Sequence, residues 1–505
     1  MRSNHLFLFP FRFDKITKKV KNFDELCSST ELFDRVDIAG KNSLIESLQE
    51  THWKYDDFKP SLDCEHYNMF SSFFDHIRPL LFNKKNEPSQ LSHLFYHEGF
   101  DEGVGYVELE FDNKVVRLEV GKLFLRIFEA GVGVFAMNLV NKEIDDQELI
   151  TKINNSLRMI YPTNISHKDG YYKENDFFDR VSFISSSGEV ASFENRFEAL
   201  EDEPPIYSYI KELIGDKLFS FSLESVGKFY IKPIIGSEMF VMCHYVDDKT
   251  FNIIRNDDEF FSKKSWQKMF LMGDEFSVVK SFGESYVQAD FHSWMSKDAV
   301  FGVSKNAFFM VTKEGNSHME EKFRKLFFKV IVLIVSIRSS INRFTEDVTS
   351  ISAICDPKVD PADNLATLES IETLYQFYVR FVNRLHFRDI TTDRDGEMLH
   401  KSVSRSNKIE KKLEMINLEI KNLYNLFNYS RTISEKRRQE FIDKLTLMGG
   451  VFLPATVLGG VFGMNIFDLN NLTWQEVVAS SVITYIFVGM FLSKAITRTL
   501  KRALG

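Results

Sequence analysis

The sequence predicts an α+β protein with three parts: a large α/β domain over residues 1–315, a helical region with a long stalk helix over 316–444, and two C-terminal transmembrane helices with a basic tail over 445–505. Three observations support this division. Short β-rich runs alternate with polar turns as far as about residue 315, and a helical pattern follows. Beyond residue 444 come two long stretches without charged residues.

The composition is that of an ordinary folded protein, since 44% of the 505 residues are hydrophobic and 27% are charged. The net charge of -9 argues against a nucleic-acid-binding protein, because a phosphate-binding surface normally shows a basic excess. No C-x-x-C pair occurs among the four cysteines, which are Cys27, Cys64, Cys243 and Cys355. We therefore expect no zinc site, no disulfide framework, no bound cofactor and a reducing compartment.

Residues 1–15 are predicted to form the first strand. Pro10, Arg12 and Asp14 interrupt their apolar stretch and no small-residue cleavage site follows, which argues against a signal peptide. A β-hairpin is predicted over 106–120, where two alternating runs flank the turn Asp112-Asn113. Further strands are expected at 124–128, 132–139, 229–235, 239–245 and 300–311, and a helix at 145–160.

Sequence motifs give weak signals in this first domain. Gly131-x-Gly133 lacks the third glycine of a dinucleotide site, so a turn or close packing is expected there. His93 and His97, next to Glu98, have the spacing of two metal ligands on one helix face, with chance spacing on a polar surface as the alternative. No P-loop, H-E-x-x-H or nucleophile elbow occurs in the sequence, and we predict that the protein is not an enzyme.

Three basic residues alternate with apolar ones in and after the predicted hairpin: Arg117, Lys122 and Arg126. They have the chemistry to hold a phosphate ligand. Charge pairing across the strands with Glu108 and Glu119 explains them as well. The sequence therefore leaves the ligand-binding residues of this domain open.

The helical region begins at Ser317, which is spaced from Glu320 as in a capping box. The first helix is expected to end near Ile354. Its apolar run 330–335 is bounded by charged residues and is far too short to cross a bilayer. We therefore expect this run to be buried in the protein.

A second helix is expected over 364–387, and a third, much longer helix from about His400. The third helix has an apolar seam at heptad spacing, formed by Ile409, Leu413, Ile416, Ile420, Leu423 and Phe427. No Pro or Gly interrupts 401–448, so the same helix can continue into the first uncharged stretch as a rod of about 70 Å. One domain cannot bury a rod of that length, so we expect association with further copies of the chain.

Residues 445–462 and 477–493 are both uncharged and just long enough to cross a bilayer, and Trp474 suits the membrane interface. The loop 463–475 between them has no Lys or Arg. Basic residues lie before the first stretch and after the second: Arg431, Lys436, Arg437, Arg438, Lys444, Lys494, Arg498, Lys501 and Arg502. The positive-inside rule then predicts a multi-pass protein of the plasma or inner membrane, with both termini and the large domain in the cytoplasm.

The run from Leu453 to Asn465 ends in Gly463-Met464-Asn465. It resembles the end of the first membrane helix in the CorA superfamily of magnesium, cobalt, nickel and zinc transporters, and the resemblance extends over residues 317–505. Such a resemblance implies a homopentamer in the lipid bilayer, whose long helices surround a central pore for divalent cations. Gly463, Met464 and Asn465 are then the selectivity filter at the outer mouth.

Asn465 suits a filter for Mg²⁺, because this ion releases its water reluctantly and a ring of amides can bind the hydrated ion. Read inward at helical spacing, one face of the helix is predicted to line the pore: Thr456, Leu453, Gly449, Leu445, Ile442 and Gln439. Thr456 offers a second polar ring, and the apolar residues offer constrictions. Packing against neighbouring helices is the alternative for each apolar position.

Two features qualify the resemblance. The better-known members continue after Gly-Met-Asn with Met-Pro-Glu-Leu, whereas 466–472 has one acid and no proline, which puts the ion preference in question. Gating in the family uses Mg²⁺ held by acidic residues between cytoplasmic domains. The acidic cluster Asp389, Asp393, Asp395 and Glu397 is a candidate for such a site, with a solvated turn as the alternative.

The resemblance predicts transport of a divalent cation, with Mg²⁺ first. A second hypothesis is a signal-gated membrane effector, since some CorA-like proteins accompany type III CRISPR systems and are thought to be opened by a nucleotide second messenger in antiviral defence. The size of the N-terminal domain and its opening run 5–13 favour this second hypothesis. A third, a cytosolic enzyme anchored by its tail, has little support in the sequence.

Overall fold

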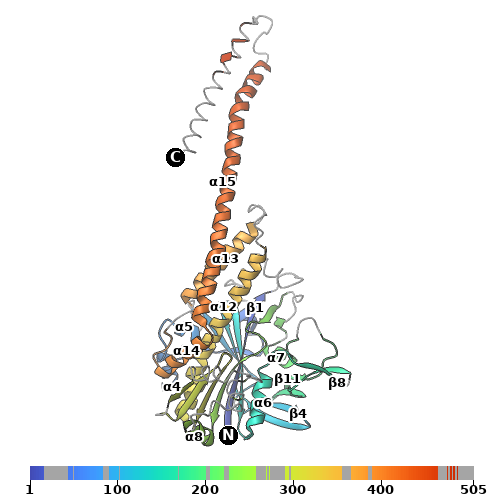
Figure 1. Ribbon diagram of the computed structural model, residues 1–505, viewed down its shortest axis with the longest axis vertical. Coiled ribbons are helices and arrows are strands. Elements are labelled where there is room, and N and C mark those ends of the chain that lie inside the picture. Colours follow the sequence, from blue (N-terminus) through green and yellow to red (C-terminus); the bar gives the residue numbers. More distant parts are fainter. Residues whose placement is uncertain are drawn as a thin grey trace. The chain divides into compact units, whose positions relative to one another are not determined.

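The computed structural model describes residues 1–15, 44–48, 50–83, 90–101, 103–168, 170–200, 205–215, 217–220, 227–256, 269, 272, 291–294, 297–354, 365–384, 389–463, 475, 478–479, 482–483 and 486. The chain forms two compact units, one of Met1–Asp356 and Ala366–Tyr424 and the other of Pro357–Leu365 and Asn425–Gly505. A large sheet with several helices makes up most of the first unit (Figure 1). The predicted α+β class is confirmed, whereas the predicted domain boundaries stay a prediction.

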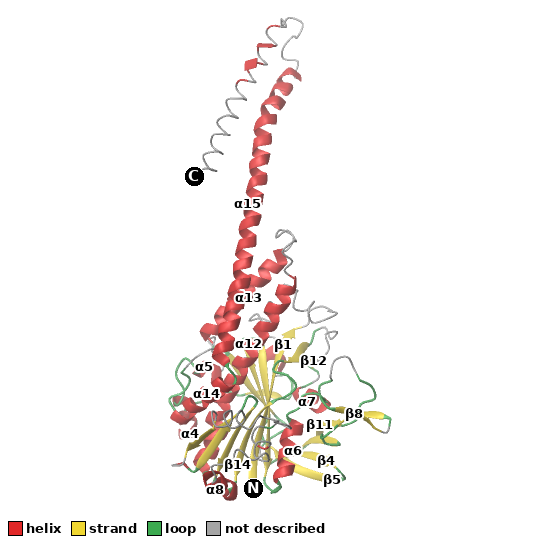
Figure 2. Cartoon of the chain, in the orientation of Figure 1, coloured by secondary structure: helices red, strands yellow, loops and turns green. Residues whose placement is uncertain are grey.

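The main sheet has the strand order β11-β10-β4-β5-β7-β1-β14-β17-β16-β15 (Figure 2). These strands are β11 (Gly188–Glu194), β10 (Arg180–Ser185), β4 (Gly105–Phe111), β5 (Lys114–Val120), β7 (Val132–Asn141), β1 (Arg2–Lys15), β14 (Phe240–Val246), β17 (Ala307–Thr312), β16 (Ala299–Val303) and β15 (Phe291–Trp294). Two branches extend it. One is β13 (Phe229–Pro233) with β12 (Phe219–Ser220), and the other is β6 (Phe124–Phe128) with β3 (Ser92–His97) and β2 (Trp53–Tyr55). A separate hairpin joins β8 (Ile165–Lys168) and β9 (Tyr171–Glu174).

β1 is a central strand of this sheet, and the prediction of a first strand is confirmed. It pairs antiparallel with β7 along one edge and with β14 and β13 along the other. Because alternate residues of a strand face opposite sides, Phe7, Phe9, Phe11 and Phe13 all enter the main apolar core. The opposite side of β1 faces α12 (Phe328–Ile354).

The predicted hairpin at 106–120 is confirmed as β4 and β5. Its turn residues Asp112 and Asn113 have φ of 46° and 59°, and two successive positive φ values are typical of a type I′ turn. The single strand predicted at 300–311 is wrong, because Val303 ends β16, Ala307 begins β17, and the two strands pair antiparallel. The other predicted strands correspond to β6, β7, β13 and β14.

The predicted helix at 145–160 is confirmed as α6 (Gln147–Leu157). Its N-cap is Asp146, whose carboxylate accepts hydrogen bonds from the backbone N–H of Glu148 and Leu149 at 2.9 and 3.3 Å. The remaining short helices of the first unit are α4 (Cys64–Ser71), α5 (Arg78–Leu81), α7 (Ser208–Ile214) and α8 (Asp248–Asn256).

One helical stretch runs through α11 (Ser317–Lys322), the π-turn η3 (Phe323–Phe327) and α12. The predicted capping box at Ser317 is wrong, because Asn316 is the N-cap and accepts from the Met319 N–H at 3.3 Å. The Asn316 amide also donates to the Lys297 carbonyl at 2.6 Å, which fixes the cap one residue earlier. The expected helix end at Ile354 and the buried run 330–335 are confirmed.

Three more helices follow: α13 (Leu365–Arg384), α14 (Arg394–Ser406) and α15 (Ile409–Gly463). The prediction of one long helix from about His400 is wrong, because His400 belongs to α14. Between α14 and α15, Lys408 has a φ of 53°, which breaks the helix. Asn407 is fixed at this break by Arg338, whose Nη1 donates to its Oδ1 at 2.9 Å.

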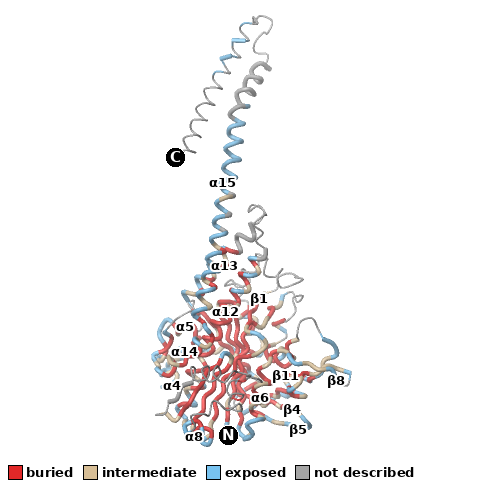
Figure 3. Tube along the Cα trace, viewed as in Figure 1, coloured by how far each residue is buried: buried red, intermediate tan, exposed pale blue. Residues whose placement is uncertain are grey.

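The predicted heptad seam lies on the first part of α15 (Figure 3). Ile409, Ile416, Ile420 and Leu423 are buried and Leu413 is half-buried, as the spacing predicts. The rings of Tyr424 and Tyr375 stack nearby, with centroids 4.4 Å apart. The side chain of Phe427 lies outside the described residues.

Among the residues that the structure describes, no helix combines the length and the apolar character that a membrane crossing needs. Of the two predicted spans, 445–462 belongs to α15, but most of its side chains lie outside the described set. The second span, 477–493, lies mostly outside that set as well.

Candidate functional site

The predicted pore-lining residues lie on the later part of α15. Gln439, Ile442, Leu445 and Gly449 are all exposed, and Ile442 and Leu445 have exposed fractions of 45% and 52%. At helical spacing these positions occupy about one third of the helix circumference. Gln439 donates from Nε2 to Asp443 Oδ1 at 3.0 Å on the same helix. Among the residues that the structure describes, none covers this face of α15.

For three of the remaining predicted pore positions, the structure describes only the backbone, which belongs to α15. Leu453 and Thr456 are helical, with side chains outside the described residues, and Gly463 is the last residue of α15. Met464 and Asn465 lie outside the described residues. The roles of these five positions stay predictions.

The exposed apolar surface of α15 extends beyond the predicted pore face. Between 441 and 452 the exposed large apolar residues are Phe441, Ile442, Leu445, Leu447, Met448 and Phe452. Five of these six positions lie within about 120° of the helix circumference, and Asp443 and Lys444 lie outside this stripe. An apolar stripe of this width normally packs against a partner surface. This segment therefore needs a covering that its own chain does not provide in the described structure.

The acidic cluster at the start of α14 is bound to lysines. Asp393 is the N-cap of α14 and accepts from the backbone N–H of Asp395 and Gly396 at 2.9 and 3.0 Å. Asp395 is 2% exposed and accepts from Lys297 and Lys322 at 2.5 and 2.6 Å. Burial by itself would raise the pKa of Asp395, but the hydrogen bonds from the two lysines outweigh it and hold that pKa below its usual value.

The sequence allowed two interpretations of the acidic cluster, a solvated turn and a metal-binding gating site, and the lysine contacts bear on both. A solvated turn is wrong for Asp395, because it is buried and paired. Among the described residues, no group of three or more His, Cys, Asp or Glu side chains could hold a metal ion. Lysines are the partners of these carboxylates, since Lys322 also donates to Asp393 at 2.7 Å.

The two histidines with metal-ligand spacing lie on a strand. His93 and His97 belong to β3, where residues four apart are about 13 Å from each other, so the helix-face prediction is wrong. His97 is 5% exposed and its Nδ1 accepts from the Gly99 N–H at 3.0 Å. Burial, with a smaller effect of nearby His52, lowers the pKa of His97 to about 4, so the ring is neutral.

The three alternating basic residues have separate roles. Arg117 donates from Nε to Glu108 Oε1 at 2.8 Å across β4 and β5, which confirms the charge-pairing interpretation for this residue. Arg126 is 3% exposed and donates to the carbonyls of Leu80 and Leu81 at 2.8 and 3.0 Å. Lys122 is exposed and lies at the edge of a cleft.

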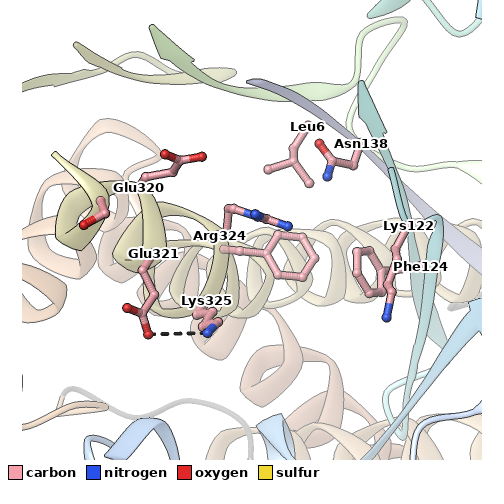
Figure 4. Close-up of a pocket in the computed structure, with 10 residues that line it drawn as sticks. Leu6, Lys122, Phe124, Asn138, Glu320, Glu321, Arg324 and Lys325 are labelled. Carbon is pink, nitrogen blue, oxygen red and sulfur yellow. Dashed lines mark hydrogen bonds and ion pairs between the residues drawn. The ribbon is translucent and has the colours of Figure 1, made fainter. Parts of the chain in front are cut away.

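That cleft has a volume of about 480 Å³ and lies within the first unit (Figure 4). Lys122, Phe124 and Asn138 line it from the sheet, and Arg324 and Phe328 line it from η3 and α12. Sequence reasoning singled out only Lys122 among these residues. The others come from segments far apart in the chain, so no local motif could have found them.

Sequence reasoning also missed a buried ionic network between β1 and α12. Arg12 and Asp14, both fully buried, are bonded by Nε and Oδ2 at 2.9 Å. Arg343 of α12 reaches Asp14 Oδ1 at 3.0 Å, and Arg12 reaches Glu346 and Asp347, both at 3.2 Å. The sequence did contain a signal for this network, because Arg12 and Asp14 are charged residues inside an apolar run. Their partners on α12 are more than 300 residues away in the sequence, so only the fold reveals them.

The glycine pair at 131 and 133 serves close packing, as predicted. Gly131 has a φ of 71°, and its carbonyl accepts from Arg343 Nη1. A Cβ at Gly133 would lie 2.3 Å from the ring of Phe11. These contacts fit a structural role for both glycines.

A model of the protein family described as "CorA-like Mg2+ transporter protein" matches residues 385–496. This part of the chain is therefore similar to the CorA superfamily. The match confirms the resemblance that the Gly463-Met464-Asn465 run indicated. One similar solved structure is the complete structure of the CorA magnesium transporter from Methanocaldococcus jannaschii, which has 13% sequence identity and a TM-score of 0.21, covering 52% of this chain and 93% of that chain. No curated protein matches the chain.

The CorA match includes α14, α15 and Gly463-Met464-Asn465. It therefore includes every residue that the sequence predicted for the pore, from Gln439 to Asn465. The sheet and α12 lie outside the matched residues. The similarity to the CorA superfamily therefore rests on the helical C-terminal part, and the cleft belongs to the part without such a match.

Proposed function

We propose that this CorA-superfamily chain conducts divalent metal cations through a membrane pore, with Mg²⁺ as the main ion and Co²⁺, Ni²⁺ and Zn²⁺ as further ions. The observation that carries this proposal is the Gly463-Met464-Asn465 sequence, which begins at the last residue of α15 and lies inside the CorA match. The CorA family consists of transporters, so the proposed activity is transport and not an enzyme reaction. Asn465 supplies neutral amides that bind a hydrated ion.

The proposed pore forms between copies of the chain, five in number, with α15 from each copy around the axis. The exposed apolar residues of α15 between 441 and 452 support association, because lipid or further copies of the helix would cover them. Basic residues on both sides of the two uncharged stretches support a membrane orientation with cytoplasmic termini.

Ion flux into liposomes tests this proposal. The purified full chain is reconstituted, and uptake of Mg²⁺, Co²⁺, Ni²⁺ and Zn²⁺ is measured separately with ion-sensitive dyes. We expect Asn465→Ala to lower the flux roughly tenfold or more, because the amide ring of the filter is lost. Asn470→Ala is the matched control, since it removes an amide from the same loop outside the motif, and it should keep the parent flux.

Parent-like flux in Asn465→Ala would contradict the assignment of Asn465 to the filter. No flux of any of the four ions with the parent chain, in liposomes that do contain the assembled protein, would count against a constitutively open pore.

A second candidate function is a nucleotide-gated CorA-like effector of antiviral defence beside a type III CRISPR system. The extent of the first unit, which packs Met1–Asp356 and Ala366–Tyr424 around one large sheet, favours a regulatory role for that unit. Rescue of a magnesium-requiring strain by this chain alone would support the transporter. Flux that appears only after addition of a nucleotide would support the effector.

A further inference from the structure

The cleft of the first unit has the dimensions of a small-molecule site. Its volume is about 480 Å³, within the range of roughly 300–1,000 Å³ for ligand pockets. The strands β1, β6 and β7 border it on one side, and α11, η3 and α12 border it on the other (Figure 4).

A buried amide without a partner lies in this cleft. Asn138 of β7 is 8% exposed, and its Oδ1 has no hydrogen-bond partner among the residues that the structure describes. Buried polar atoms are normally bonded, so an unbonded one at a cleft wall indicates a group that a ligand satisfies. Figure 4 shows the Asn138 side chain beside Leu6 at the cleft wall.

Two cations flank the same space. Lys122 is exposed, and its Nζ lies 5.8 Å from the centroid of the Tyr96 ring. Arg324 is exposed on η3 and extends into the cleft (Figure 4). Arg and Lys together suit a phosphate group, because guanidinium gives a planar pair of donors and ammonium a point charge.

Two glutamates, Glu320 and Glu321, also line the cleft. Glu321 pairs with Lys325 at 3.4 Å, and Lys325 also pairs with Glu65. Figure 4 shows Glu320 at the opposite end of the cleft from Lys122. The end of the cleft at Lys122 therefore carries the positive charge of that lysine.

Two aromatic rings form an apolar surface next to these cations. The centroids of Phe124 and Phe328 are 5.5 Å apart and the rings are tilted by 42°. Such faces favour a flat ring in a ligand. The apolar surface and the positive end together select a molecule with both a ring and an anionic group.

The helix that supplies Arg324 is irregular at this point. Arg324 and Lys325 belong to the π-turn η3, which lies between two α-helical segments. A π-turn adds one residue to a helical turn, and such turns occur frequently at functional sites. Here the extra residue changes the direction in which the side chains of α11 and η3 point relative to those of α12.

We propose that this cleft binds a small organic phosphate with a flat ring. The phosphate lies between Lys122 and Arg324, the ring lies against Phe124 and Phe328, and the Asn138 amide forms a hydrogen bond with the ligand. The proposal concerns binding in the first unit and does not depend on either candidate function of the pore.

Calorimetric titration of the purified full chain in detergent tests the proposal. The probes are AMP and phenyl phosphate, which contain both ligand features, together with adenosine and inorganic phosphate, which contain one each. We expect AMP or phenyl phosphate to bind at least tenfold more tightly than either half-probe. Binding is measured without ion flux, so its outcome is separate from that of the transport experiment.

Two variants locate the binding to the cleft. Lys122→Gln should weaken binding of the phosphate probe at least tenfold while leaving the affinity for adenosine unchanged. Lys152→Gln is the matched control, because Lys152 also lies over an aromatic ring, that of Phe111 at 4.7 Å, but outside the cleft. It should keep the parent affinity.

Three results would overturn the proposal: no binding of AMP and phenyl phosphate at millimolar concentration, equal binding of a half-probe, or an equal effect of the two lysine variants. Lys122 is exposed, so its variant keeps the fold, which an unchanged thermal unfolding midpoint verifies.

Discussion

The two ends of α15 differ in how their apolar residues are covered. Near its start, Ile416 and Ile420 are each 1% exposed, because other elements of the first unit pack on them. Further along, Phe441, Met448 and Phe452 are 62%, 58% and 67% exposed. Both segments are rich in large apolar residues, so composition alone does not distinguish them. The difference teaches that the first segment is covered within the first unit, whereas the second segment is not covered by any part of the chain that the structure describes.

The largest loss of unfolding free energy is expected from a change in the ionic network that joins β1 to α12 within the first unit. Asp14→Ala removes one of the two carboxylates that the buried Arg12 and Arg343 share, the other being Asp347. Removal of one partner from a buried ion pair typically costs about 3–5 kcal/mol, so the free energy of unfolding should fall by that amount. Chemical denaturation of the full chain in detergent, followed by circular dichroism, measures it.

A matched control for this network is Lys232→Ala, which removes the half-exposed pair of Lys232 with Glu346 at 3.5 Å. Such a pair contributes about 0–1 kcal/mol. Similar losses in the two variants would show that the buried network stabilises the first unit no more than a surface ion pair does.

The same Ile-to-Ala substitution at one buried and one exposed position of α15 tests the difference between its two segments. Ile416→Ala removes a buried side chain and should lower the free energy of unfolding of the first unit by about 2–4 kcal/mol. Ile442→Ala changes a side chain that is 45% exposed in the single chain, so the same measurement should change little. If copies of α15 cover Ile442, this variant should instead weaken assembly, which light scattering of the detergent-solubilised protein detects.

An unchanged assembly in Ile442→Ala would contradict a contact between copies at this position. A large loss of unfolding free energy in Ile442→Ala would show that the chain itself covers the residue, and the distinction between the two segments of α15 would be lost.

Local patterns predicted the elements of this fold better than their junctions. The hairpin turn Asp112-Asn113 and the seam through Ile416 depend on nearby residues, and both are confirmed. The predicted start of the long helix was wrong because the helix breaks at Lys408, beside Asn407, which accepts a hydrogen bond from Arg338 of another helix. The helix propensities of residues 401–448 could not have indicated that contact.

The candidate sites show the same difference between contiguous motifs, which the sequence revealed, and sites assembled from distant segments, which it did not. Gly463-Met464-Asn465 is a contiguous motif, so one segment of sequence was enough to indicate the family that the 385–496 match supports. The cleft combines Asn138 of β7 with Arg324 of η3, which are far apart in the chain. Likewise, Asp395 resembled a solvated acid because its lysine partners, Lys297 and Lys322, come from earlier segments.

The smallest effect expected for a single residue is a pH dependence of the first unit, where three buried histidines are neutral. Burial lowers the pKa of His5 and of His97 to about 4 and that of His244 to about 3, with nearby His52 contributing at His97. The unfolded chain binds protons at a pKa near 6.5, so stability is complete above that pH and falls as the pH decreases toward 4. At pH 5, each of these histidines should lower the free energy of unfolding by about 2 kcal/mol relative to pH 8. His97→Phe should reduce this pH dependence, whereas replacement of the exposed His318 by Phe should preserve it; equal profiles for both variants would contradict the assignment to buried histidines.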